Sequence, residues 1–94
     1  MQTSSETQVV EARVTLPGDV DLHARPAANF VRAAMRFSAK VSVAAGDREV
    51  DAKSLLSVLA LGARRGTIIR LRAEGEDAAA AIAALATTVA ELRE

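Results

Sequence analysis

The hydrophobic residues of this chain change their spacing along the sequence, and this change restricts the fold more than any other feature. Within residues 9–16 they alternate with polar residues, which is typical of a strand with one buried face. Within residues 24–37 they recur every three or four positions, as they do on one face of a helix. The two periods together predict a domain that contains both strands and helices.

Four strands are expected from these patterns. Their ranges are 9–16, 40–45, 48–51 and 67–74. Gly46 and Asp47 can form a tight turn between the second strand and the third, so these two strands are predicted to pair as a hairpin. Ile69 and Leu71 give the last strand its buried run.

Three helices are expected between and after these strands. They cover about residues 24–37, 55–61 and 78–92. Asp51 or Ser54 can cap the second helix at its start, and Gly62 can end it. Asp77 can cap the third helix in the same way. One apolar face of the third helix is predicted to be buried, and it consists of Ala78, Ile82, Leu85, Val89 and Leu92.

The elements follow the order strand, helix, strand, strand, helix, strand, helix. In this order the helices are expected to gather on one face of a four-stranded sheet, which is an α+β fold. The 94 residues suffice for one compact domain, expected over residues 9–94 after a polar, disordered tail of residues 1–8. Only two residues are aromatic, so the core must consist mainly of Val, Leu, Ile and Ala.

The composition excludes several classes of function. Twelve basic and twelve acidic residues give a net charge of zero, which offers no reason to expect nucleic-acid binding. Without cysteine and with a single histidine, the chain has no disulfide, thiolate site or multi-histidine metal site, and no cofactor is expected. No apolar run approaches the roughly twenty residues of a membrane span. We therefore expect a soluble cytoplasmic protein without membrane insertion.

The only histidine, His23, is predicted to lie at the start of the first helix. Pro26 fits the first turn, where the N–H group that proline lacks has no partner within the helix. A helix start attracts anions, and a neutral imidazole is a nucleophile that can accept a phosphoryl group. Arg25 offers a planar set of donors to phosphate oxygens. The alternative is an ordinary surface histidine near a helix cap.

A basic stripe is predicted along the first helix. Its members, spaced by four, three and four positions, are Arg25, Asn29, Arg32 and Arg36. The stripe is either an ordinary solvated face or, with Arg32 at its centre, a docking surface for an acidic partner.

The second helix carries more large apolar residues than one buried face of so short a helix can use. They are Leu55, Leu56, Val58, Leu59 and Leu61. Either all of them belong to the core, or some are exposed and form a contact patch for partner proteins.

The segment Leu22-His23-Ala24-Arg25-Pro26-Ala27 is followed by Lys53-Ser54-Leu55-Leu56, Leu61-Gly62 and Gly66-Thr67. In this order the motifs resemble HPr, the histidine-containing phosphocarrier family of the bacterial phosphoenolpyruvate-dependent sugar phosphotransferase system. The resemblance covers about residues 10–92. It implies an open-faced sandwich in which three helices cover one face of a mainly antiparallel sheet.

The resemblance also implies roles for individual residues. His23 matches the histidine that takes a phosphoryl group on Nδ1 from phospho-enzyme I and passes it to an enzyme IIA domain. Arg25 matches the arginine that helps to hold this group. Ser54 matches a regulatory serine that an ATP-dependent kinase phosphorylates in some bacteria. The family's apolar contact patch corresponds to Leu55, Leu56 and Leu59.

The segment before the histidine departs from the family pattern. Asp21 stands where the family usually has glycine, and Val20 replaces a small polar residue. The segment 17–22 is also longer by about two residues. An aspartate near a phosphoryl group either repels it or points away and raises the basicity of the histidine.

Three functions follow as hypotheses. The first is a monomeric phosphoryl carrier that is not itself an enzyme. The second is a regulatory binding module of the nitrogen-related or catabolite-control kind, in which the phosphorylation of His23 or Ser54 signals to partner proteins. The third, an ATP-dependent catalyst, has no support in the sequence, which contains no phosphate-binding glycine loop.

Overall fold

The computed structural model describes residues 8–93, and within them the chain forms four strands and three helices. Their order is β1 (Val9–Thr15), α1 (Ala24–Ala34), β2 (Lys40–Ala45), β3 (Arg48–Asp51), α2 (Leu55–Leu61), β4 (Ile68–Glu74) and α3 (Ala78–Ala90). This order confirms the predicted one. The tail expected over residues 1–8 lies outside the described residues except for Gln8, whose carbonyl accepts a hydrogen bond from the backbone N–H of Gly75.

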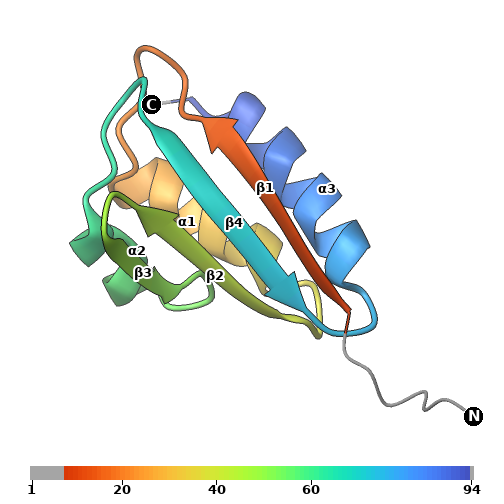
Figure 1. The fold of residues 1–94 in the computed structure, drawn as a ribbon. Helices are drawn as coiled ribbons and strands as arrows, with labels where there is room; N and C mark the ends of the chain where they lie inside the picture. Colours follow the sequence, from red (N-terminus) through yellow and green to blue (C-terminus); the bar gives the residue numbers. More distant parts are fainter. Residues whose placement is uncertain (1–7, 94) are drawn as a thin grey trace, which may run out of the picture.

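The four strands form a single sheet with the order β1-β4-β2-β3, and all three pairings are antiparallel. The helices lie together on one face of the sheet, and the other face is left uncovered (Figure 1). The predicted α+β sandwich with one open face is therefore confirmed. No helix within residues 8–93 is long and apolar enough to span a membrane.

The register of the strands explains how alternating residues build the core. Leu71 in the central strand β4 pairs with Ala12 on one side and with Val43 on the other. Leu71 and Val43 are buried and Ala12 packs against the core, so this row lies on the face that the helices cover. Because neighbouring residues of a strand point to opposite faces, the residues between them point to the open face. Leu71 and Val43 are fully buried, as the alternation predicted.

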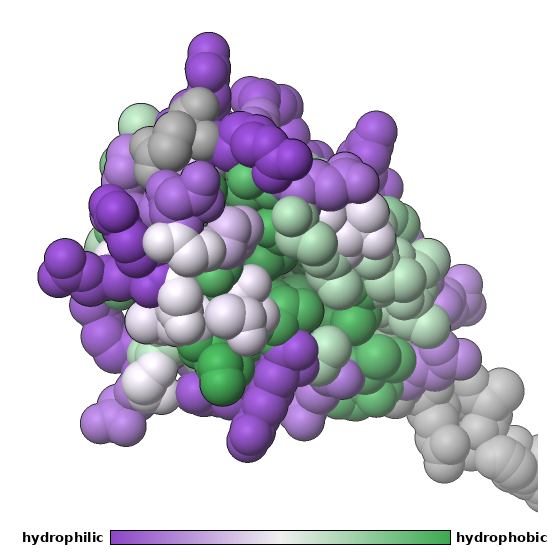
Figure 2. All heavy atoms as spheres, turned by 90° about the horizontal axis from the view of Figure 1, so that it is seen from above, coloured by the Kyte–Doolittle hydropathy of each residue, from purple (hydrophilic) through white to green (hydrophobic). Residues whose placement is uncertain are grey.

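Alanine fills much of the core, as expected for a chain with two aromatic residues. Phe30 of α1 is fully buried, whereas Phe37 is only partly buried. The predicted apolar face of the third helix is buried, with Ala78, Ile82, Leu85 and Val89 on α3. Leu92 is buried too, but it lies two residues past the end of α3 at Ala90, so the helix is shorter than predicted. Seen from above, apolar residues reach the surface in a band that hydrophilic residues border (Figure 2).

The first helix ends earlier than its hydrophobic spacing predicted. It stops at Ala34 and is followed by a tightened turn, in which the N–H groups of Arg36 and Phe37 donate to the carbonyls three residues earlier. The prediction that the helix reaches Phe37 was therefore wrong. Phe37 still packs against the core from the turn, which explains why the spacing continued past the helix end.

Asp77 was predicted to cap α3, and this is correct only for its position. It is the N-cap residue, but its side chain makes no hydrogen bond to the helix. The carboxylate instead accepts hydrogen bonds from the backbone N–H groups of Ser38 and Ala39, each at 2.8 Å. At Gly75 a Cβ atom would come within 3.0 Å of the Cα of Ala39, so the β4–α3 loop and the start of β2 approach closely.

Candidate functional site

His23 is the N-cap residue of α1, as the sequence predicted. Its backbone is extended, with φ −126° and ψ −177°, and its carbonyl accepts the first helical hydrogen bond from Ala27 N–H at 2.9 Å. The imidazole is exposed and makes no cap hydrogen bond to the first turn. Pro26 lies buried in that turn. The histidine thus stands at the end of α1 where the helix dipole favours an anion.

Arg25 also belongs to the first turn of α1, two residues after His23, and it is exposed. A guanidinium group at this place adds positive charge to that of the helix start. Because a planar guanidinium matches two oxygens of a phosphoryl group, the pair His23 and Arg25 offers a nucleophile and a charged donor together.

The segment between β1 and α1 is hydrogen-bonded to the turn between α2 and β4. Leu16 N–H donates to the Thr67 carbonyl at 2.9 Å, and Gly66 N–H donates back to the Leu16 carbonyl at 3.1 Å. Closer to the histidine, Leu22 N–H donates to the Ala63 carbonyl at 2.9 Å. Figure 1 shows these two segments beside each other at one end of the sheet. The approach to His23 is therefore held by residues that come much later in the chain.

Asp21 takes part in the same connection. Its carboxylate accepts a hydrogen bond from the Arg65 backbone N–H at 2.7 Å and forms an ion pair with the Arg65 side chain at 3.2 Å. These side-chain and backbone hydrogen bonds, with the charges of Arg65 and Arg64, lower the pKa of Asp21 to about 2. The sequence had singled out Asp21, but no signal in it pointed to Arg65, which lies 44 residues away.

Ser54 is the N-cap of α2, which confirms the second of the two predicted caps. Its hydroxyl oxygen accepts a hydrogen bond from Ser57 N–H at 3.2 Å. Asp51, the other candidate, accepts instead from Lys53 N–H at 2.9 Å in the preceding turn. Gly62 ends the helix with φ 66°, a left-handed conformation that glycine adopts without strain.

The apolar residues of α2 divide between the core and the surface. This agrees with the second expectation, that some of them are exposed. Val58 and Leu61 are buried and Leu59 is partly buried, whereas Leu55 is 40% and Leu56 80% exposed. α2 packs against α1, so the exposed leucines belong to the helix next to the one that His23 begins.

The basic stripe is shorter on α1 than predicted, because Arg36 lies beyond the helix end. Arg32 is exposed, and its guanidinium donates to the side-chain oxygen of Asn29. Both residues still line one shallow hollow with Arg36, at which α3 contributes Thr88. The basic character of this face is thus retained past the end of the helix.

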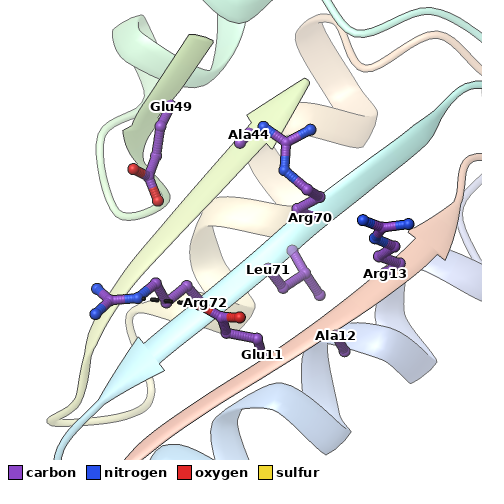
Figure 3. A pocket seen from close by; sticks show the side chains of 8 residues that line it. All are labelled: Glu11, Ala12, Arg13, Ala44, Glu49, Arg70, Leu71 and Arg72. Carbon is purple, nitrogen blue, oxygen red and sulfur yellow. Dashed lines mark ion pairs between the residues drawn. The ribbon is translucent and has the colours of Figure 1, made fainter. Parts of the chain in front are cut away.

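A separate hollow of about 580 Å³ lies on the open face of the sheet (Figure 3). Charged side chains from neighbouring strands line it, and Arg72 forms ion pairs with Glu11 at 3.3 Å and with Glu74 at 3.2 Å. None of the residues predicted for the site lies here. Within residues 8–93 there is also no group of three His, Cys, Asp or Glu side chains that could hold a metal ion.

Comparison with curated proteins finds phosphocarriers. The HPr phosphocarrier protein of Buchnera aphidicola is 40% identical over 82 residues, which cover 87% of this chain and 94% of that protein. A multiphosphoryl transfer protein of Haemophilus influenzae is 42% identical over 92 residues, or 90% of this chain. The chain spans only 18% of the length of that longer protein.

Comparison with solved structures gives the same fold. The phosphocarrier protein HPr of Bacillus anthracis is similar with a TM-score of 0.82 and 38% identity, covering 86% of this chain and 96% of that one. Crh, the catabolite repression HPr of Bacillus subtilis, is similar with a TM-score of 0.67 and 37% identity, covering 89% and 100%.

The family model matches nearly the whole described chain. It is described as the PTS HPr component phosphorylation site and covers residues 10–91, from the second residue of β1 to the C-cap residue of α3. Together with the order of strands and helices, the exposed histidine at the start of α1 and the similarity to whole HPr proteins, this match shows that the chain belongs to the HPr phosphocarrier family.

Proposed function

We propose that this chain accepts a phosphoryl group on His23 from phospho-enzyme I and passes it to an enzyme IIA domain. The observation that carries the proposal is the exposed imidazole at the N-cap of α1, within a chain that the HPr family model matches. The chain is then a carrier, and its partner proteins supply most of the catalytic groups.

The transfer is an in-line exchange of one bond to phosphorus for another. The lone pair on Nδ1 of neutral His23 attacks phosphorus, and the bond between phosphorus and the donor atom breaks as the new P–N bond forms. The electron pair of the broken bond leaves with the donor. The positive end of α1 and the Arg25 guanidinium favour the negative oxygens of the phosphoryl group. Transfer to enzyme IIA reverses these roles.

The partner surface that we propose consists of the exposed leucines of α2 and the basic side of α1. Leu55 and Leu56 supply apolar contact, with Leu59 partly buried behind them. Arg32 supplies positive charge on the neighbouring helix. A partner that fits this surface carries an apolar pocket with acidic residues at its border, which is what we expect of enzyme I and enzyme IIA.

We also propose that phosphorylation of Ser54 by a serine kinase regulates docking. The Ser54 hydroxyl lies at the start of α2, where the helix dipole tolerates added negative charge. The same charge stands next to Leu55 and Leu56, so it repels an acidic partner that docks on the leucines. Phosphorylation would thus weaken docking without unfolding α2.

Intact-mass spectrometry at mildly alkaline pH tests the carrier proposal, because phosphohistidine is labile in acid. The protein is incubated with phosphoenolpyruvate and the enzyme I of its own host, and wild type is compared with His23→Ala. We expect one phosphate on the wild type, lost on acidification, and none on the variant. A phosphate that persists in His23→Ala, or a wild type that stays unmodified, contradicts the proposal.

A second candidate is a regulatory binding module, and the similarity to the catabolite repression HPr of Bacillus subtilis favours it. In that case the same leucines bind a regulated protein rather than a phosphotransfer partner. An unmodified wild type in the host's own system, with docking that Leu56→Ala abolishes, would support the module over the carrier.

A further inference from the structure

The segment that leads into His23 carries an ion pair between Asp21 and Arg65. We propose that Arg65 is a positioning residue for phosphoryl transfer at His23, because it holds the Asp21 carboxylate and balances its charge beside the phosphoryl group. This inference rests on the proposed function, since it concerns how His23 takes up that group.

Arg65 binds the Asp21 carboxylate through three hydrogen-bond donors. Its backbone N–H donates to Oδ1 of Asp21 at 2.7 Å, its Nε to Oδ1 at 3.3 Å and its Nη2 to Oδ2 at 3.2 Å. With both oxygens engaged, the direction of the carboxylate is fixed rather than left to rotate. The Asp21 side chain is only 24% exposed, which is low for an aspartate in a surface loop.

The position of Asp21 is passed on to His23 through the backbone. His23 N–H donates to the Asp21 carbonyl at 2.9 Å, and Leu22 between them is buried and bonded to Ala63. Arg65 follows Ala63 by two residues, so both ties connect the approach to His23 with the same turn. The N-cap residue of α1 is therefore placed by contacts with a distant segment.

The Asp21–Arg65 ion pair matters for a phosphoryl carrier because Asp21 is negatively charged. The Cα atoms of Asp21 and His23 are at most about 7 Å apart, because they are separated by two peptide units. A phosphoryl group brings up to about two negative charges, and the Debye length in physiological salt is about 8 Å. A carboxylate two residues from His23 that is not balanced by a positive charge disfavours phosphohistidine, whereas the Arg65 guanidinium opposes that repulsion.

Arg65 could act by balancing the charge of Asp21 or only by supporting the local structure. These two roles predict different results and can be separated by substitutions. Arg65→Gln removes the guanidinium but keeps the backbone N–H that donates to Asp21, so we expect this variant to fold. If charge balance is the role, adding Asp21→Asn removes the unbalanced carboxylate and restores transfer. If Arg65 is only a brace, the second substitution restores nothing.

The test measures the rate at which His23 takes up a phosphoryl group from enzyme I and phosphoenolpyruvate. Wild type, Arg65→Gln, Asp21→Asn and the double variant are compared at about 0.05 M and about 0.5 M salt, since added salt screens exposed charges. We expect Arg65→Gln to be about fivefold slower than wild type in low salt, and the double variant to stay within about twofold of Asp21→Asn. The deficit of Arg65→Gln should shrink in high salt.

Arg64→Gln is the matched control, because it removes the same charge from the neighbouring residue, which acts on Asp21 through charge alone. We expect less than about a twofold change. Wild-type rates for Arg65→Gln, or a double variant as slow as Arg65→Gln at both salt concentrations, would overturn the inference while the carrier function stands. A wild type in which His23 takes up no phosphate overturns the proposed function and the inference with it.

Discussion

The two helices that meet at the candidate site begin in different ways. α2 begins with a local cap, in which the Ser54 hydroxyl accepts from Ser57 N–H three residues later. α1 begins with His23, whose side chain makes no cap bond, and the residues before it are tied to a segment more than forty positions away. One start is closed by its own neighbours, and the other is placed by a distant part of the chain.

This difference separates two uses of the same helix position. At α2 the N-cap side chain contributes to folding, because it satisfies a donor of the first turn. At α1 the tertiary contacts of Leu22 and Asp21 hold the helix start, so the N-cap position can carry an imidazole instead of a capping side chain. We infer that the long-range placement of α1 is what permits a histidine without a cap hydrogen bond at its start.

The largest expected effect comes from giving α1 the kind of start that α2 has. His23→Ser removes the proposed phosphoryl acceptor and supplies a capping hydroxyl. We expect complete loss of phosphoryl uptake, measured by intact mass, together with a gain of about 0.5–1 kcal/mol in the free energy of unfolding. His23→Ala is the control, with the same loss of uptake and a stability change within about 0.5 kcal/mol. A destabilised His23→Ser protein would contradict the contrast between the two helix starts.

The second prediction tests the division of α2 between core and surface. Val58 is fully buried, so Val58→Ala should lower the free energy of unfolding by about 2 kcal/mol through lost contacts and a small cavity. Leu56 is 80% exposed, and Leu56→Ala should change stability by less than about 0.5 kcal/mol. Chemical denaturation measures both values.

For the binding of enzyme I we expect the opposite order of effects, with Leu56→Ala more harmful than Val58→Ala. Titration calorimetry should show docking weakened about tenfold by Leu56→Ala, because an exposed leucine in the interface loses apolar contact. Folded Val58→Ala should bind as wild type does. Equal effects of the two substitutions on docking would remove Leu56 from the proposed partner surface.

Local patterns in the sequence were sufficient for most of the fold. The bounds of β2 and β3 agree with the prediction, because a glycine turn between two alternating segments depends only on neighbours in the chain. Gly62 was identified as the end of α2 for the same reason, and Ser54 was one of two candidates for its start. His23 was correctly placed at the start of α1, while its role as phosphoryl acceptor stays a prediction.

The partners of two aspartates could not be predicted from the sequence, because they depend on long-range contacts. The Asp77 carboxylate bonds to Ser38 and Ala39, 39 and 38 residues away, instead of capping its own helix. Asp21 likewise pairs with Arg65, which composition and spacing do not connect to it. A short polar side chain such as aspartate can accept from any donor that the fold brings near, so its partner depends on tertiary structure.

The third prediction concerns the cap of α2. Ser54→Ala should lower the free energy of unfolding by about 1 kcal/mol, since Ser57 N–H loses its partner in the first turn. For a domain of this size the melting temperature should fall by roughly 4–8 °C. Ser54→Asp should keep the stability, because aspartate caps as well as serine does, but should weaken docking of enzyme I. If Ser54→Ala melts as wild type does, the hydroxyl is not a working cap.

The smallest expected effect separates the two helix starts by pH. The pKa of Asp21 is lowered to about 2 by the hydrogen bonds and charge of Arg65, whereas an unfolded aspartate titrates near about 3.9. Between these values the unfolded chain binds a proton that the native carboxylate does not. The stabilising contribution of Asp21 is therefore complete above about pH 4 and is lost as the pH falls through about 2.

Melting curves should show the stability advantage of wild type over Asp21→Asn shrinking as the pH falls from about 4 to about 2. Ser54 has no group that titrates there, so the deficit of Ser54→Ala should stay constant with pH. A constant deficit for both variants would mean that the Arg65 contacts do not distinguish the native from the unfolded carboxylate. The start of α1 would then depend on the backbone hydrogen bonds that Leu16 and Leu22 make with residues 63–67.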